Sequence, residues 1–166
     1  MRTSFSVLLA AGLLTSQMAV AQCARPTDTT AFDIAGLKTS LMITALTCNA
    51  NEKYDAFVLK YRPELANQDK VLGSYFSRAH GRQGRTRQDD YVTQLANSQS
   101  QTGLRQGSLF CNYNLPIFDE VMALRGSNEL PDYAAARSVA QPITVGNCGV
   151  AEQTTTASAG RPRKRS

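Results

Sequence analysis

The chain has 166 residues, with 18 Lys and Arg, 13 Asp and Glu and one His, which gives a formal net charge of +5. The body carries none of this charge: five basic residues lie near the ends, and removing them leaves 13 basic against 13 acidic residues over residues 23–160. These five are Arg2, Arg161, Arg163, Lys164 and Arg165. The distribution argues against a nucleic-acid-binding protein, while the length and the 42% hydrophobic content suit one folded domain.

Residues 1–21 have the features of a secretory signal peptide. A positive start is followed by a short apolar run over residues 7–14 and by a small-x-small cleavage site at residues 19–21. The apolar run is shorter than the ~20 residues that cross a bilayer. Gln22 directly before Cys23 disfavours a lipoprotein. We therefore expect an exported bacterial protein, periplasmic or extracellular, with no transmembrane segment in the mature chain.

The four cysteines all follow the expected cleavage site, and they are Cys23, Cys48, Cys111 and Cys148. An even number in an oxidising compartment predicts two disulfides. A helix over residues 29–48 would be ~30 Å long, whereas the Cα atoms of a bridged pair lie within ~7 Å. Cys23–Cys48 is therefore the least favoured pairing, and we predict Cys48–Cys111 with Cys23–Cys148. The wide cysteine spacing disfavours a metal site, and we expect no cofactor.

The first half of the body has the apolar period of helices. Residues 29–50 are apolar at steps of three or four, which predicts a helix with one buried face. The same period recurs over residues 54–61, and we expect Pro63 to end that helix and to open the next. The next helix is expected to stop at His80, with Gly81 as a left-handed cap. The candidate N-caps of the first helix are Thr27, Asp28 and Thr29.

A loop over residues 80–87 is expected to follow, because it contains two glycines and no apolar residue. A fourth helix is predicted from Thr86, where Asp89 three residues later resembles a capping box. Negative charge at Asp89 and Asp90 would then lie in the first turn, where the helix dipole favours it. Gly103 is the expected end of this helix.

The last part of the body is predicted to hold shorter helices. Residues 108–124 are apolar around Pro116, which indicates either a kinked helix or two short ones, with Asn114 capping the second. Residues 130–139 form a final predicted helix, and residues 141–150 an extended segment or turn that contains Cys148. The fold class is therefore all-α, with five to six helices in a domain over residues 22–150. Residues 151–166 are predicted to form a disordered basic tail.

Basic residues surround the single histidine, and no acidic residue occurs from Lys70 through Gln88. Guanidinium groups and glycine N–H groups in such a loop suit a carboxylate, a phosphate or a sulfated sugar. A solvated basic loop whose charges answer Asp89 and Asp90 is the plainer alternative. The candidate anion-binding residues are Arg78, His80, Arg82, Arg85 and Arg87.

The sequence gives less support to a catalytic site than to a binding site. His80 with Ser74 or Ser77 lacks a GxSxG elbow, and the surrounding cations disfavour a protonated imidazole. A glycosidase needs two carboxylates, for which Glu52 and the Asp89–Asp90 pair are the candidates. The polar residues 97–101 suit either a sugar-binding groove or a frayed helix end.

The sequence thus favours a binding module of the cell envelope, which contacts an anionic component or another envelope protein and no nucleic acid. The tail cations Arg161, Arg163, Lys164 and Arg165 would add weak, salt-dependent binding to polyanions. The alternative is a small periplasmic hydrolase that acts on cell-wall glycan.

Overall fold

The structure is a computed structural model, and it describes residues 23–148 of the chain. Three long helices, α2 (Pro26–Cys48), α3 (Asn51–His80) and α4 (Gly84–Gln106), are followed by the short helices α5 (Phe110–Asn114), α6 (Pro116–Ala123) and α7 (Leu130–Arg137). Short 3-10 turns precede α4, α5 and α7, at Gly81–Gln83, Gly107–Leu109 and Ser127–Glu129. The all-α class is confirmed. The predicted signal peptide and basic tail lie outside the described residues.

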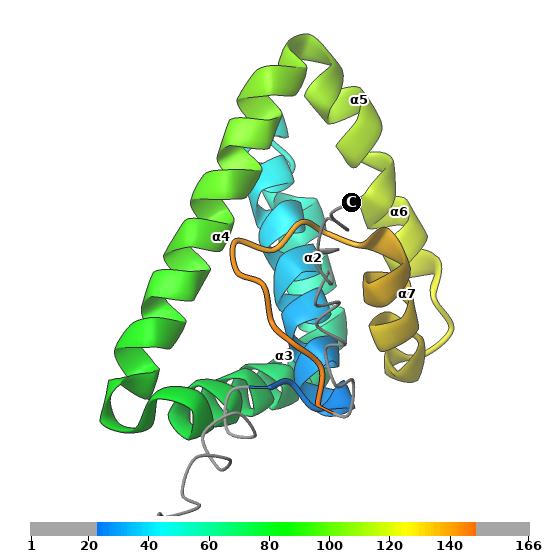
Figure 1. Ribbon diagram of the computed structural model, residues 1–166. Coiled ribbons are helices and arrows are strands. Elements are labelled where there is room, and N and C mark those ends of the chain that lie inside the picture. Colours follow the sequence, from blue (N-terminus) through cyan, green and yellow to red (C-terminus); the bar gives the residue numbers. More distant parts are fainter. Residues whose placement is uncertain (1–22, 149–166) are drawn as a thin grey trace, which may run out of the picture.

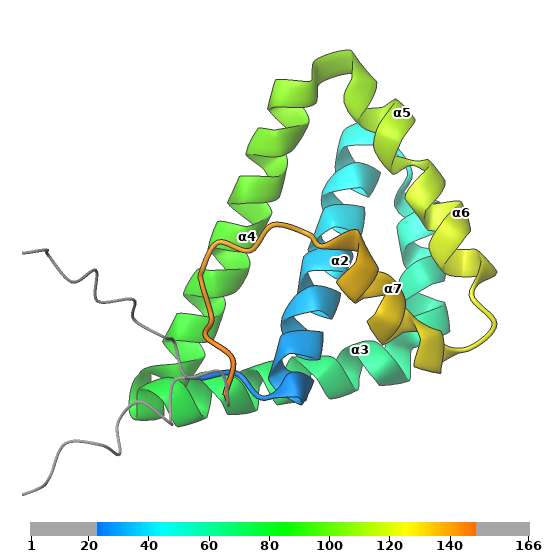
Figure 2. The ribbon, with the colours of Figure 1, turned by 45° about the vertical axis from the view of Figure 1, so that its right-hand side comes forward.

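Helices α3, α4, α5 and α6 form a triangular frame around α2. Figures 1 and 2 show the C-terminal part of α3 along the base, α4 rising along one side and α5 and α6 descending along the other. Helix α2 runs through the middle, where it contacts α3, α4, α5 and α7. Among the described residues, α2 is also the one helix long and apolar enough to cross a membrane, a test that the core helix of a folded protein passes equally.

Two hydrophobic clusters bury α2 on two faces, so the single buried face predicted for it is wrong. One cluster joins Leu37 and Leu41 of α2 to Phe57 of α3 and to α6 and α7. The other packs Phe32 of α2 against the second half of α3 and against Tyr91 of α4. A helix that is apolar around most of its circumference belongs in the interior, which explains the central position.

The start of α2 also differs from the prediction. The helix begins at Pro26 with Arg25 at the N-cap position, so neither threonine caps it. Asp28 lies in the first turn, where its carboxylate accepts a hydrogen bond from the Arg25 backbone N–H at 2.8 Å. Pro26 suits the first helical position because its missing N–H would have no partner within the helix.

Helix α3 continues through Pro63, where a break between two helices was predicted. A proline inside a helix removes one hydrogen bond and costs ~3 kcal/mol. Figures 1 and 2 show that α3 changes direction along its length, as helices with an internal proline do. Side chains on both sides of the proline are anchored, with Phe57 and Tyr61 in one cluster and Phe76 in the other. This packing offsets the cost of the proline.

The predicted loop over residues 80–87 is a tight elbow instead. Gly81 ends α3 as predicted, but its φ of +55° and ψ of −125° are not the left-handed helical conformation predicted for this cap, and α4 begins at Gly84 after one 3-10 turn. The capping box at Thr86 is therefore absent, and Asp89 and Asp90 lie beyond the first turn of α4. Helix α4 also continues past Gly103 to Gln106, and the ring of Phe110 packs against this glycine.

We expect Gly84→Ala to lower the free energy of unfolding by about 2 kcal/mol, as overpacked sites do. A Cβ atom at Gly84 would lie 2.7 Å from Ser77 Cα and 2.8 Å from the Phe76 carbonyl oxygen, so α3 and α4 would have to separate. Gly146→Ala is the matched control, since a Cβ there meets nothing within 4 Å. Urea unfolding followed by circular dichroism measures both, and equal stabilities would contradict the close crossing.

Residues 108–124 contain two short helices, α5 and α6, rather than one kinked helix, and α6 begins at Pro116. Asn114 does not cap α6, whose N-cap position is Leu115. The side-chain amide of Asn114 instead donates to the Phe110 carbonyl at 2.8 Å. Helix α7 covers most of the predicted residues 130–139 and has Pro131 in its first turn. After α7 residues 139–148 form no helix, and they end in a single bridge and a turn at Cys148.

The predicted cysteine pairing is confirmed. Cys48 at the end of α2 is bridged to Cys111 of α5, with Cα atoms 5.7 Å apart. Cys23 is bridged to Cys148, with Cα atoms 5.0 Å apart. Backbone hydrogen bonds from Ala24 N–H to the Gly146 carbonyl and from Cys148 N–H to the Ala24 carbonyl adjoin this bridge. They fix the end of residues 139–148, which we call the strap.

Candidate functional site

Arg78 lies at the elbow, but its guanidinium is paired inside the protein. Its Nη2 lies 2.5 Å from a carboxylate oxygen of Asp28, whose side chain is only 2% exposed. The guanidinium also lies over the ring of Tyr75, 5.9 Å from its centroid. Arg78 therefore joins the end of α3 to the start of α2. Because its guanidinium is paired with Asp28, Arg78 is less available to bind an anion than the sequence predicts.

The other predicted anion-binding residues are spread over the elbow. His80, Arg82, Arg85 and Arg87 are all exposed. The imidazole of His80 stacks on the ring of Phe76, with centroids 6.0 Å apart. Of the five predicted residues, Arg85 lines a hollow between α3 and α4.

That hollow lies where α3 meets α4, has a volume of about 590 Å³, and is called the elbow groove below. Helix α3 supplies three polar residues that are four and three positions apart. This spacing places them on one face of the helix. Helix α4 supplies a guanidinium and an amide, and a glycine completes the lining. The lining residues are Lys70, Gly73, Ser74, Ser77, Arg85 and Gln88.

Packing fixes the polar side chains of the elbow groove only in part. A Cβ atom on Gly73 would lie 3.3 Å from Gln88 Oε1, so the glycine leaves room for the amide to lie over α3. The Ser74 hydroxyl donates to the Lys70 carbonyl at 2.9 Å within α3. A rotation of this hydroxyl would let it donate to a ligand instead.

The electrostatics of the elbow groove favour an anion. Two cations line it, and no carboxylate does. Within residues 23–148, neither Lys70 nor Arg85 has an acidic partner within 4 Å. Asp89 is four residues from Arg85 on α4, the spacing of a helical ion pair, yet the two do not form one. An anionic ligand would therefore bind to cations that form no ion pair with a carboxylate of the described residues.

Sequence reasoning found Arg85 but did not name Lys70 or Gln88 as ligands. The signal was present as the stretch from Lys70 through Gln88 without an acidic residue. What the sequence did not show is the elbow, which brings the start of α4 against the polar face of α3.

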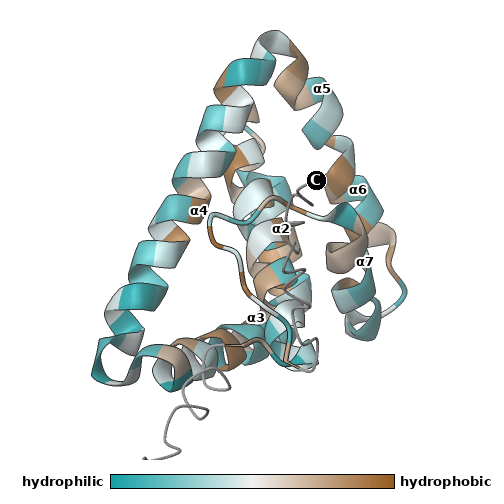
Figure 3. Ribbon diagram, viewed as in Figure 1, coloured by the Kyte–Doolittle hydropathy of each residue, from teal (hydrophilic) through white to brown (hydrophobic). Residues whose placement is uncertain are grey.

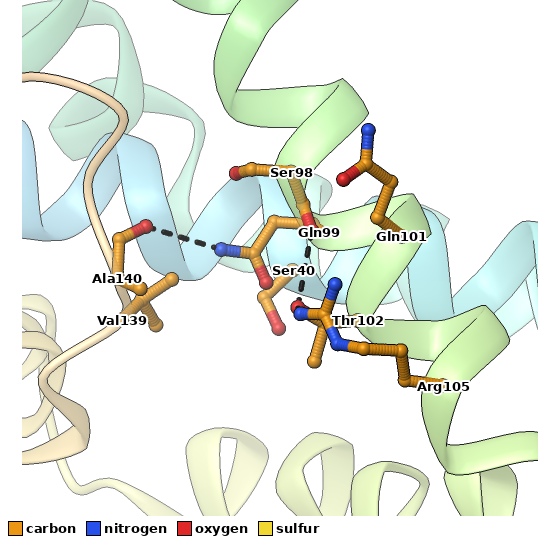
Figure 4. A pocket seen from close by; sticks show the side chains of 8 residues that line it. All are labelled: Ser40, Ser98, Gln99, Gln101, Thr102, Arg105, Val139 and Ala140. Atoms are coloured by element: carbon orange, nitrogen blue, oxygen red, sulfur yellow. Dashed lines mark hydrogen bonds between the residues drawn. The ribbon is translucent and has the colours of Figure 1, made fainter.

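A second hollow, the polar cleft, lies between α2, α4 and the strap, with a volume of about 310 Å³. Figure 4 shows the side chains of Gln99, Thr102 and Arg105 gathered near Ser40 of α2. Val139 and Ala140 of the strap form the remaining wall. Residues 97–101, predicted as a sugar groove or a frayed end, are helical, and three of them, Ser98, Gln99 and Gln101, line this cleft.

The predicted catalytic carboxylates are not brought together. Glu52 lies in the first turn of α3, while Asp89 lies in α4 beyond the other end of that 30-residue helix. Glu52 lines an open hollow of about 520 Å³ beside Cys48, and it is the single carboxylate among the described residues of that lining. A glycosidase pair needs carboxyl groups ~5–10 Å apart, and the Glu52–Asp89 pair does not provide this.

Within the described part of the chain, no group of three or more His, Cys, Asp or Glu residues is arranged to hold a metal ion. Comparison with protein families, with curated proteins and with solved structures finds no match to this chain. Fold and site together define a disulfide-bridged, all-α protein with polar surface hollows. Two disulfides are typical of proteins that fold in an oxidising compartment, and they are compatible with export.

Proposed function

We propose that this protein is an exported binding module of the bacterial cell envelope, which holds a phosphate-bearing component in its elbow groove. The observation that carries the proposal is the pair of cations, Lys70 and Arg85, that line the groove without any carboxylate. A guanidinium grips a phosphate through two parallel N–H donors, while an ammonium acts as a point charge. Ser77 and Gln88 place additional hydroxyl and amide groups at the same hollow.

Export is the second part of the proposal, and it rests on the features of residues 1–21 together with the two disulfides. In the periplasm, phosphate groups are present on lipid headgroups and on lipopolysaccharide. The cations at residues 161–165 would add a weak and salt-dependent attraction to the same surfaces.

We expect Lys70→Ala/Arg85→Ala to weaken binding to phosphatidylglycerol vesicles at least about tenfold, the loss expected when charge-assisted hydrogen bonds are removed. Co-sedimentation at about 0.15 M ionic strength, where the Debye length is about 8 Å, measures the bound fraction, with phosphatidylcholine vesicles as the uncharged reference. Inorganic phosphate, titrated by NMR, should shift the amide signals of residues 73–77 and 84–88 in the native protein and not in the variant.

The matched control is Arg62→Ala/Arg125→Ala, which removes the same charge from exposed positions away from the elbow. It should change binding by no more than about twofold, because charges farther than the Debye length are screened. Equal losses in both double variants would show a general charge effect and contradict the groove. Removal of residues 160–166 separates the contribution of the tail.

The hydrolase alternative has a direct test in zymography on purified peptidoglycan. A clearing zone that Glu52→Gln or Asp89→Asn abolishes would establish catalysis and contradict a protein that acts by binding alone. We expect no clearing zone, since the structure separates these two carboxylates.

A further inference from the structure

The inner face of α4 changes character along its length. Tyr91 and Leu95 are buried against Phe32 of α2 and close the interface between the helices. The next positions on the same face, three and seven residues after Leu95, are Ser98 and Thr102, both half-buried. Figure 3 shows that hydrophilic residues predominate on α4. Apolar packing therefore stops after Leu95, and the polar cleft begins there.

Hydrogen bonds prearrange the polar cleft. Gln99 Nε2 donates to the Ala140 carbonyl at 3.3 Å, and Arg105 Nη2 donates to Thr102 Oγ1 at 2.8 Å (Figure 4). The strap beside them is held by Gln141, whose amide donates to the Phe32 carbonyl at 3.1 Å and accepts from the Tyr91 hydroxyl at 2.7 Å. Burial, with a smaller contribution from Asp33, raises the pKa of Tyr91, which keeps this hydroxyl protonated.

The lining matches the chemistry of a sugar that carries a carboxylate. Hydroxyl and amide groups both donate and accept, as the hydroxyls of a sugar do. Arg105 has N–H donors beyond the one that it gives to Thr102, and its fork geometry suits a carboxylate. No acidic side chain lines the cleft, and among the described residues Arg105 forms no ion pair. The volume of about 310 Å³ lies at the low end of ligand pockets, ~300–1,000 Å³, which limits the occupant to a small ligand.

We propose that the polar cleft is a second binding site, separate from the elbow groove, which takes a single acidic sugar residue. Ser40 and Thr102 contact its ring hydroxyls, Val139 supports its apolar face, and Arg105 holds its carboxylate. The site is open to solvent, so affinity for a free monosaccharide is weak and the carboxylate provides the selectivity.

The test compares glucuronate with glucose by NMR titration of the whole protein. Glucuronate should shift the amide signals of residues 98–105 and 139–140, and it should bind about tenfold more tightly than glucose, as one charge-assisted contact implies. Arg105→Gln should remove this tenfold preference and leave glucose binding within about twofold. Arg62→Gln, the same change at an exposed site on α3, should leave both titrations unchanged.

Three results would overturn the inference. The first is the absence of shifts with either sugar, and the second is equal binding of glucose and glucuronate by the native protein. The third is a shift confined to residues 73–77 and 84–88, which would place the anion in the elbow groove and leave the proposed function standing. Gln101→Ala is a second variant, exposed on α4 and expected to weaken both sugars about threefold, a fraction of one hydrogen bond.

Discussion

Replacing both Cys23 and Cys148 with serine should lower the free energy of unfolding by about 5 kcal/mol. The bridge links residues separated by 125 positions, and the chain-entropy relation for a loop of this length gives a loss of about that size. Domains of this kind have total stabilities of ~5–15 kcal/mol, so this loss is a third or more of the total. Guanidinium unfolding followed by circular dichroism measures the loss.

The second disulfide provides the comparison. Cys48→Ser/Cys111→Ser opens a loop with a separation of 63 and should cost about 4 kcal/mol. Loss of Cys23–Cys148 should also free the strap, because the amides of Ala24 and Cys148 form backbone hydrogen bonds beside that bridge. Hydrogen exchange should therefore accelerate at these two amides in the first variant only. A loss below about 1 kcal/mol, or the same exchange pattern in both variants, would contradict this assignment.

Arg78→Ala should lower the free energy of unfolding by about 3 kcal/mol, the low end of the range for breaking a buried ion pair. Asp28 is 2% exposed and Arg78 is 29% exposed by side chain, so the variant leaves a buried carboxylate that retains its hydrogen bond from the Arg25 backbone but loses its cationic partner. Arg82→Ala, a change of the same charge at an exposed neighbour, should stay within about 0.5 kcal/mol of the native protein.

A double-mutant cycle separates the ion pair from other effects of the substitution. Asp28→Asn with Arg78→Ala should cost less than the sum of the two single changes by at least about 1 kcal/mol, because each single change already breaks the pair. Additive losses would show that the two side chains do not stabilise each other.

Local patterns predicted the helical class and most of the helical regions. The apolar period marked residues 29–50 and 54–61, and the glycine at position 81 marked the end of α3 correctly. The helix end predicted at Pro63 is wrong, because the rule that proline ends a helix describes the local chain without tertiary packing. In the folded protein, Tyr61 and Phe76 on either side of the proline are buried in separate clusters. That burial outweighs one lost hydrogen bond.

The candidate site was only partly predictable. The absence of acidic residues from Lys70 through Gln88 predicts an anion-binding site, and Arg85 does line the elbow groove. Arg78 was grouped with it because the two are close in sequence. Its partner, Asp28, is 50 residues away and lies in another helix, and no local pattern reports such a distant charge.

The sequence by itself determined that this is a disulfide-bridged helical protein whose body has no net charge, because periodicity, cysteine spacing and charge position are properties of the chain. The tertiary structure decided which cations are paired with an acid and which line the groove, because α3 and α4 meet at Gly84 and Arg78 turns toward Asp28. It also decided that the polar residues of α4 line a cleft. The strap, held beside the Cys23–Cys148 bridge, lies opposite them, and a contact between such distant segments exists only once the chain has folded.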